Sequence, residues 1–333
     1  MNLENKPIFV HGLSRSGTTL MCTLLDAHRD VAMSYELYPP MLVTKEPVDL
    51  DRLASGLLAH SDINVIRRKH PEVFPSQLIQ NFILRVARGG LNHHDFARFV
   101  QALDREGLGF DTVAGRMRLI EMLGLEKMKR SGKSRWGMKN SADFADYLSV
   151  WPEAIFLNML RDGRDVLASQ LNTGKFDPDP KVLGANWSKA MQELEQLAAR
   201  PDVRAKMVRY ETLAHEPESV LKEICALASL DFDPAMLHHT EQDLTIFKVR
   251  HLSGKRLSQS VDTSMIGRWK TDLSREQFDG FMSSAADTME HFGYTDLAGE
   301  TLRPTKSKPS KIPDKPAASS WLSRIKSLMR KAK

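Results

Sequence analysis

Residues 8–21 constrain this chain more than any other stretch, because they change from an apolar run to a glycine-bounded loop and then to helical spacing. Residues 8–10 are typical of a buried strand, and Gly12 and Gly17 bound the loop that follows it. Backbone N–H groups of a loop that leads into a helix point toward one place, and the helix dipole favours negative charge there. The segment therefore predicts a strand, an anion-binding loop and a helix.

The loop nearly matches the nucleotide-binding pattern G-x-x-x-x-G-K-[ST], with Gly12, Gly17 and Thr19 in register. Thr18 stands where that pattern has lysine, and the loop carries its cation earlier, at Arg15. The lysine contacts the β- and γ-phosphates of a nucleoside triphosphate. Its absence predicts a ligand that has a phosphate-like group without a triphosphate tail. An ordinary strand-to-helix turn is the simpler alternative, but Ser-Gly-Thr-Thr is an unusual helix start without an anion.

A second strand, turn and helix are predicted in the middle of the chain. Residues 154–160 form an apolar run of strand length, and Arg161 follows at its carboxyl end. Ser169 lies two helical turns later, in the helix that the turn begins. Both side chains are therefore expected to reach one phosphate group.

These segments resemble the sulfotransferases that use 3′-phosphoadenosine 5′-phosphosulfate (PAPS). The 5′-phosphosulfate loop of that family reads P-x-x-R-S-G-T-T-x-L, and its 3′-phosphate segment reads R-D-x-R-x-x-x-x-S. Residues 266–270 resemble its G-R-W element, and residues 206–211 resemble its R-Y-E strand. The resemblance covers roughly residues 8–294. It implies transfer of a sulfuryl group from PAPS to a hydroxyl of a carbohydrate, lipid or peptide acceptor, without a metal.

The resemblance also implies which residues bind the donor. Tyr210 either stacks on the adenine or packs beneath the sheet, while Ser264, Lys255 and Arg256 are weaker candidates for contacts with the donor. The expected donor-binding residues are Arg15, Ser16, Gly17, Thr18, Thr19, Arg161, Ser169 and Tyr210.

Three residues are expected to act on the chemistry. Sulfuryl transfer depends mainly on positioning and electrostatics, so the leaving phosphate needs cations, and Arg15 is one of them. The block around His28 resembles the protein-tyrosine and related prokaryotic sulfotransferases, and this likeness implies that Glu36 is the general base. By the same likeness, Lys139 bridges the leaving oxygen and the sulfonate. His11 and His28 are the rival bases, and a solvated glutamate or a surface lysine is the simpler alternative for each residue alone.

Composition limits the class of protein. The two cysteines, Cys22 and Cys225, lie far apart, so the sequence predicts neither a disulfide framework nor a cysteine-rich metal site. The histidines cluster only as the pairs His93–His94 and His238–His239, and neither pair has carboxylate or cysteine neighbours at ligand spacing. The N-terminus leads directly into the first strand, and no stretch reaches the ~20 apolar residues of a membrane span. A cytoplasmic enzyme is therefore expected.

The positive net charge of +5 comes from the residues at the C-terminal end of the chain. Residues 303–333 contain ten basic residues and one acid, whereas the remaining residues contain 37 bases and 41 acids. The folded part is therefore not expected to bind nucleic acid. Residues 321–333 form a predicted short amphipathic helix, which either lies on an anionic membrane surface or belongs to a solvated disordered tail.

The expected architecture is α/β: a P-loop-like parallel sheet flanked by helices, within a sulfotransferase domain of residues 1–302. Residues 45–130 are expected to be a helical insertion that binds the acceptor, and residues 303–333 to be a basic tail. Two other functions stay open. One is a small-molecule kinase or nucleoside-phosphate hydrolase with the same loop, and the other is a non-catalytic nucleotide-binding protein that associates with membranes.

Overall fold

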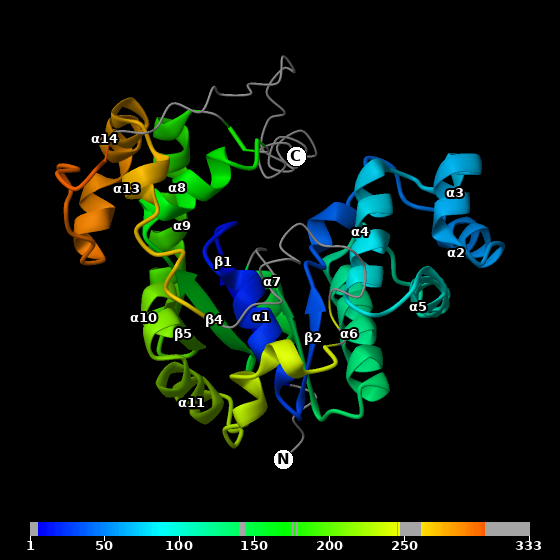
Figure 1. The fold of residues 1–333 in the computed structure, drawn as a ribbon. Helices are drawn as coiled ribbons and strands as arrows, with labels where there is room; N and C mark the ends of the chain where they lie inside the picture. The colour runs from blue at the N-terminus through cyan, green and yellow to red at the C-terminus, as the bar shows by residue number, and fades with distance from the viewer. Residues whose placement is uncertain are drawn as a thin grey trace. The chain divides into compact units, whose positions relative to one another are not determined.

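A computed structural model describes residues 6–139, 144–174, 176–177, 179–244, 246 and 261–303. Its five strands form one parallel sheet in the order β2-β3-β1-β4-β5, flanked by helices (Figure 1). This arrangement confirms the α/β fold. The strands are β1 (Ile8–Gly12), β2 (Val31–Tyr35), β3 (Arg135–Lys139), β4 (Ile155–Leu160) and β5 (Arg204–Arg209).

The described residues form two compact units. The first contains the described residues up to Val10, Thr19–Phe156 and the described residues between Lys222 and Ser260. The second contains His11–Thr18, Leu157–Leu221 and the residues from Val261. The helix that follows the loop, α1 (Thr18–Ala27), thus begins with one residue of the second unit and continues in the first.

The first unit holds the helical insertion. Residues 45–130 contain helices and no strand, as the sequence predicts. Helix α6 runs along β2 and β3 (Figure 1), and a Cβ added at Gly124 would lie 2.4 Å from a ring carbon of Trp136, so only glycine permits this approach. A short helix, η1 (Pro39–Leu42), precedes this region, whose helices are α2 (Leu50–Leu58), α3 (Ile63–Lys69), η2 (Pro71–Val73), α4 (Gln77–Arg88), α5 (His93–Arg105) and α6 (Val113–Arg130).

Aromatic side chains fill the core of the first unit around Phe9. Its ring centroid lies 4.6 Å from that of Tyr147 and 5.5 Å from that of Phe156. Such rings contribute large buried apolar areas, which stabilise the fold mainly through the hydrophobic effect. The remaining helices of this unit include α7 (Phe144–Val150), η3 (Pro234–Met236) and η4 (His239–Glu241).

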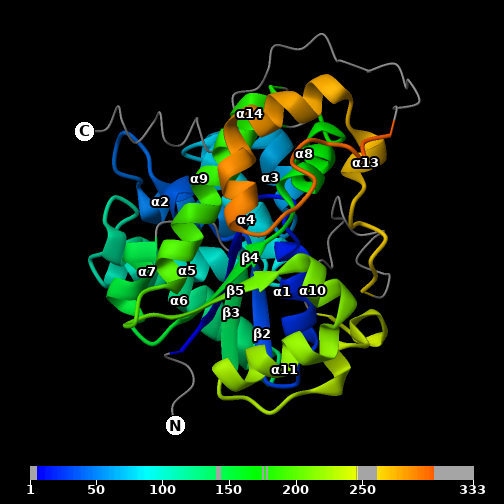
Figure 2. The same cartoon turned by 90° about the vertical axis from the view of Figure 1, so that its left-hand side faces the viewer.

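The second unit is built on a pair of long helices, α9 (Pro180–Ala198) and α14 (Arg275–His291), which lie side by side (Figure 2). Gly184 allows this approach, because an added Cβ would lie 2.6 Å from the carbonyl oxygen of Phe281. Trp187 is buried against the Phe281 ring, with centroids 6.1 Å apart. The other helices here are α8 (Gly163–Leu171), α10 (Tyr210–His215) and α13 (Trp269–Asp272), and α11 (Pro217–Leu227) has residues in both units.

Two predictions differ from the structure or lie beyond it. The R-Y-E segment is not wholly a strand, since β5 ends at Arg209 and Tyr210 begins α10. Lys255, Arg256 and the tail from residue 304 onward lie outside the described residues. Across the described part of the chain, we find no helix with the length and apolar character needed to span a membrane.

Candidate active site

The loop between β1 and α1, which the sequence predicts to bind an anion, is closed by its own hydrogen bonds. The backbone N–H and the hydroxyl of Ser16 both donate to the Leu13 carbonyl, at 3.0 and 2.7 Å. Gly12 has a φ of 150°, and an added Cβ there would lie 2.6 Å from Ser16 Oγ. Gly17 also has a positive φ, of 95°. The two glycines are therefore needed for a loop this tight.

Arg15 joins this loop to helix α8. Its Nε donates to Ser169 Oγ at 2.8 Å, although the two residues lie 154 positions apart in the sequence. Arg15 has a φ of 79°, an unfavourable backbone conformation for a residue with a Cβ. Gln170 Nε2 reinforces the connection by donating to the Ser14 carbonyl at 3.0 Å. The two segments predicted to bind the phosphates of one ligand are thus brought together within the second unit.

Arg161 links the loop to a later segment. Its Nη1 donates to the Arg15 carbonyl at 2.9 Å, and its Nη2 donates to the Met265 carbonyl at 2.6 Å. Its guanidinium also lies 4.5 Å from the ring centroid of Tyr210. A Cβ added at Gly17 would lie 2.6 Å from the same ring. The buried Tyr210 therefore packs between the loop and Arg161.

Asp165, which the sequence analysis did not single out, holds the segment after residue 265. Its carboxylate accepts the backbone N–H groups of Gly267 at 2.8 Å and Trp269 at 2.9 Å. Trp269 is a core residue and lies under the Arg164 guanidinium at 4.0 Å. Burial, and then the charge of Asp162, raise the pKa of Asp165 to about 6 despite these bonds.

We expect the Asp165→Asn variant to differ from the parent in the pH dependence of its stability. Because the pKa of Asp165 in the folded state exceeds its ordinary value, the folded protein binds more protons between pH ~4 and ~6. As the pH rises from ~4 to ~6, the free energy of unfolding of the parent should therefore fall by about 2–3 kcal/mol relative to that of the variant. Urea denaturation at several pH values measures this difference. The exposed Asp287→Asn change is the control, and parallel curves for Asp165→Asn and parent would contradict the expectation.

The first unit contains a second cluster, centred on Glu36 just after β2. Lys139 ends β3, and its Nζ donates to Glu36 Oε1 at 2.6 Å and to Thr19 Oγ1 at 3.1 Å. Arg85 on α4 donates through Nη1 to Glu36 Oε2 at 2.9 Å. Register explains the meeting of the first two residues, because Tyr35 is paired with Lys139 in the sheet. The two residues expected to act as base and as cation are therefore in direct contact.

The charges around Glu36 determine its ionisation. Burial opposes the charged form, but Lys139 and then Arg85 outweigh it and lower the pKa of Glu36 to about 2. Glu36 is therefore a carboxylate at all ordinary pH values. A carboxylate held by two cations is a weak base, so its basicity has to increase before it accepts a proton.

The structure places the two rival bases in other environments. The backbone N–H of Asp30 donates to His28 Nδ1 at 3.0 Å, so the His28 Nε2–H donates to the Asp231 carbonyl at 2.9 Å. Both ring nitrogens of His28 therefore serve as connections within the first unit. His11 is buried, and this burial lowers its pKa to about 3, which keeps the ring neutral.

Sequence reasoning missed Arg85 and Asp165. Arg85 lies within a helical insertion that has no recognisable motif, and only the packing of α4 against β2 brings it to Glu36. The sequence did contain a signal for Asp165. In the Arg161–Ser169 segment Asp162 caps helix α8, and Asp165 is a second acidic residue that follows it. The weaker candidate Ser264 donates its backbone N–H to Asp262 Oδ1 at 2.8 Å.

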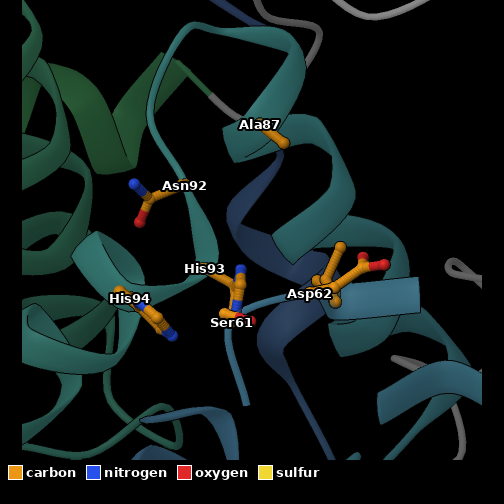
Figure 3. Close-up of a pocket in the computed structure, with 7 residues that line it drawn as sticks. Ser61, Asp62, Ala87, Asn92, His93 and His94 are labelled. Atoms are coloured by element: carbon orange, nitrogen blue, oxygen red, sulfur yellow. The ribbon is translucent and has the colours of Figure 1, made fainter. Parts of the chain in front are cut away.

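A cavity of about 260 Å³ lies in the helical insertion, in the first unit (Figure 3). The imidazoles of His93 and His94 line it, and the Nε2 atoms of both bond to the His60 carbonyl at 2.8 Å. No group of three potential metal ligands occurs among the residues that the structure describes. The bonds of the two imidazoles to the His60 carbonyl hold the loop before α3 in place.

The chain is similar to known sulfotransferases in sequence and in fold. A model of the sulfotransferase family matches residues 7–234. Protein-tyrosine sulfotransferase A of Caenorhabditis elegans is 23% identical over 321 residues, which cover 92% of this chain and 70% of the relative. Protein-tyrosine sulfotransferase 1 of Danio rerio is 22% identical over 311 residues, which cover 88% of this chain and 73% of the relative.

Two solved sulfotransferase domains share the fold. The domain from the curacin biosynthetic pathway has a TM-score of 0.54 at 17% identity, over 87% of this chain and 98% of that domain. The domain from the Synechococcus PCC 7002 olefin synthase has a TM-score of 0.51 at 18% identity, over 87% of this chain and 96% of that domain. Since the family model matches more than half of the chain, this protein belongs to the sulfotransferase family.

Proposed function

We propose that this enzyme transfers the sulfuryl group of PAPS to an acceptor hydroxyl. The observation that carries the proposal is the hydrogen bond between Arg15 and Ser169, which joins the two segments whose patterns are typical of a phosphosulfate loop and a 3′-phosphate site. Membership of the sulfotransferase family favours this function over a kinase and over a non-catalytic nucleotide-binding protein.

The second unit supplies groups for two phosphates of one donor. Backbone N–H groups at the start of α1, together with the Arg15 guanidinium, suit the 5′-phosphosulfate, because the first turn of this helix contains no acidic residue. Arg161 and the Ser169 hydroxyl suit the 3′-phosphate. Tyr210 packs between Gly17 of the loop and Arg161, and so lies between the two groups of phosphate-binding residues.

The first unit supplies the groups for proton transfer and charge neutralisation. The acceptor oxygen attacks sulfur and forms an O–S bond, while the bond between sulfur and the bridging oxygen of the donor breaks. The electron pair of that bond remains on the departing 3′,5′-bisphosphoadenosine, and Lys139 neutralises its increasing charge. The acceptor proton passes to Glu36. The loop and the Lys139 contact are adjacent along the chain, because Thr18 of the loop is followed directly by Thr19, which contacts Lys139.

The ion pair between Lys139 and Glu36 makes the basicity of Glu36 depend on the position of Lys139. While Lys139 remains on Glu36, the carboxylate is a weak base with a pKa of about 2. When Lys139 moves to the departing phosphate, the carboxylate loses one of its two cations and its proton affinity increases. The base therefore becomes effective when a donor is present to attract the lysine.

The proposal is tested by ligand preference and by product formation. Thermal melting should show stabilisation by 3′,5′-bisphosphoadenosine and none by ATP with Mg²⁺. Incubation with sulfur-labelled PAPS and three acceptor classes, a tyrosine-containing peptide, a sugar glycoside and a long-chain alcohol, should transfer the label to at least one class. Stabilisation by ATP with Mg²⁺ alone, or no label in any acceptor, would contradict the proposal.

We expect Arg161→Ala to weaken 3′,5′-bisphosphoadenosine binding more than Ser169→Ala. A hydrogen bond to a charged group contributes ~1.5–3 kcal/mol, which is a factor of about 10 to 150 in affinity. Ser169→Ala removes a neutral donor and should cost about two- to tenfold. Isothermal calorimetry measures both. Adenosine 5′-phosphosulfate, which has no 3′-phosphate, is the control ligand. An equal loss of affinity for both ligands would show that the two residues do not contact the 3′-phosphate.

A further inference from the structure

Both carboxylate oxygens of Glu36 are held by cations that come from different elements. Lys139 of β3 binds Oε1 at 2.6 Å, and Arg85 of α4 binds Oε2 at 2.9 Å. The proposed function explains the first contact, because Lys139 holds Glu36 as a weak base until it moves to the leaving phosphate. It does not explain the second contact. Arg85 comes from the helical insertion and is 49 residues from Glu36 in the sequence.

Arg85 also binds the main chain of the same residue. Its Nη1 lies 3.2 Å from the Glu36 carbonyl oxygen as well as 2.9 Å from Oε2. Glu36 has a φ of 47°, in the left-handed region that is costly for residues other than glycine. A residue in such a conformation persists only where its surroundings hold it, and a single guanidinium here holds both the backbone and the side chain.

Helix α4 is well placed to keep Arg85 in position. Gly89 follows the helix directly, and a Cβ there would lie 3.4 Å from the backbone nitrogen of Tyr35, the residue before Glu36. The end of the helix therefore meets the end of β2 with no side chain between them. Arg85 lies one turn earlier and, like Glu36, is largely withdrawn from solvent, with 19% and 28% of their side chains exposed.

We infer that Arg85 is a positioning residue, which keeps Glu36 Oε2 bound when Lys139 departs, so that Oε1 is the oxygen that takes the acceptor proton. This inference rests on the proposed function. It assigns different roles to the two cations: Lys139 moves between the base and the leaving group, and Arg85 stays. Arg85 suits the fixed role, because its planar guanidinium can engage a carboxylate and a carbonyl together, whereas a lysine is a flexible point charge.

The groups that face Glu36 determine how its titration should respond. They are Lys139 from β3, Arg85 from α4, the Tyr35 hydroxyl from β2, and Thr19 and the Cys22 thiol from α1. Burial raises the pKa values of Tyr35 and Cys22 far above their usual range, so both stay neutral. Loss of Arg85 therefore removes one of two positive charges near Glu36, and the pKa of Glu36 should move up from about 2.

The test compares Arg85→Gln with Arg85→Lys and with a matched control, Arg88→Gln. Arg88 lies on the same helix and makes no ion pair within the described residues. Turnover is measured from pH 4 to 9 with labelled PAPS and whichever of the three acceptor classes is sulfated. Affinity for 3′,5′-bisphosphoadenosine is measured by calorimetry, and the Glu36 carboxyl is titrated by carbon-13 NMR, with Glu36→Gln used to assign its signal.

We expect Arg85→Gln to lower kcat about tenfold or more, with nucleotide affinity within about twofold of the parent. The NMR titration of Glu36 should move to higher pH, and kcat/KM of the variant should begin to fall at the acid end of the measured range, where the parent profile stays flat. Arg85→Lys should restore part of kcat, and Arg88→Gln should match the parent. Parent-like turnover in Arg85→Gln would overturn the inference. So would a loss of turnover in which the melting temperature and nucleotide affinity fall in parallel and the Glu36 titration does not move.

Failure of the proposed function gives a different result. If the parent transfers no label to any acceptor, the sulfuryl-transfer proposal fails, and with it the role of Oε1. The NMR titration needs no donor, so it still reports whether Arg85 holds the Glu36 carboxylate.

Discussion

Glu36→Gln should reduce turnover by about 10²–10⁴-fold while leaving 3′,5′-bisphosphoadenosine affinity close to that of the parent. The amide retains the size of the side chain but cannot take the acceptor proton. Glu36 belongs to the first unit, whereas every residue expected to bind the donor except Thr19 belongs to the second, so the two properties should separate. Single-turnover kinetics at saturating donor and acceptor, with chemistry shown to be rate-limiting, measure the change.

The substitution also leaves Lys139 and Arg85 beside a neutral amide, so stability has to be checked. Folded Glu36 has a depressed pKa, so its contribution to stability is present above pH ~4.5 and is lost as the pH falls toward about 2. The melting temperature of Glu36→Gln should therefore approach that of the parent at low pH. Parent-like turnover would exclude Glu36 as the base. The ring environments of His11 and His28 make neither of them an evident replacement.

Lys139→Ala should lower turnover by about 10²–10³-fold, because its ammonium is needed most when the departing phosphate gains charge. The same change also removes a cation from Glu36, which makes the carboxylate more basic, so the two effects oppose each other. The measured loss is therefore a lower limit on what Lys139 contributes at the leaving group. Steady-state kinetics with saturating PAPS measure it, and the exposed Lys129→Ala is the control.

The Glu36→Gln background separates these two effects of Lys139. In that background no carboxylate is present to be activated or restrained, so any further loss on Lys139→Ala reports the leaving group alone. We expect an additional decrease of at least tenfold. Equal turnover of Glu36→Gln and the double variant would show that Lys139 acts only through Glu36.

The elements that carry the candidate site could be predicted from local sequence. The apolar run before Gly12 and the glycines of the loop required a strand followed by a tight turn, and β1 and α1 lie there. The apolar run before Arg161 became β4, and α8 followed it. Such features are encoded locally, because strand length, helical spacing and the need for glycine at positive φ depend on residues close in sequence.

Contacts between distant segments could not be predicted in the same way. The sequence placed Arg15 and Ser169 near phosphates, but their mutual hydrogen bond depends on how the loop and α8 pack in the second unit. Tyr210 was assigned either to the adenine or to the core, and its position against Gly17 follows from α10 beginning where β5 ends. The connection through both nitrogens of His28 was also invisible in the sequence.

The sequence by itself determined the first strand with its glycine-bounded loop and helix, the strand and helix around Arg161, and the position of Lys139 at the end of a strand. The strand before Glu36, β2, was seen only in the structure. Only the tertiary structure decided that Glu36 is shared between Lys139 and Arg85, and that its pKa is lowered to about 2. The physical reason is that a backbone conformation depends on neighbours in the chain, whereas the proton affinity of a carboxylate depends on every charge and buried surface around it in space. Arg85 has no local pattern that marks it, and the packing of α4 against β2 alone brings its charge to Glu36.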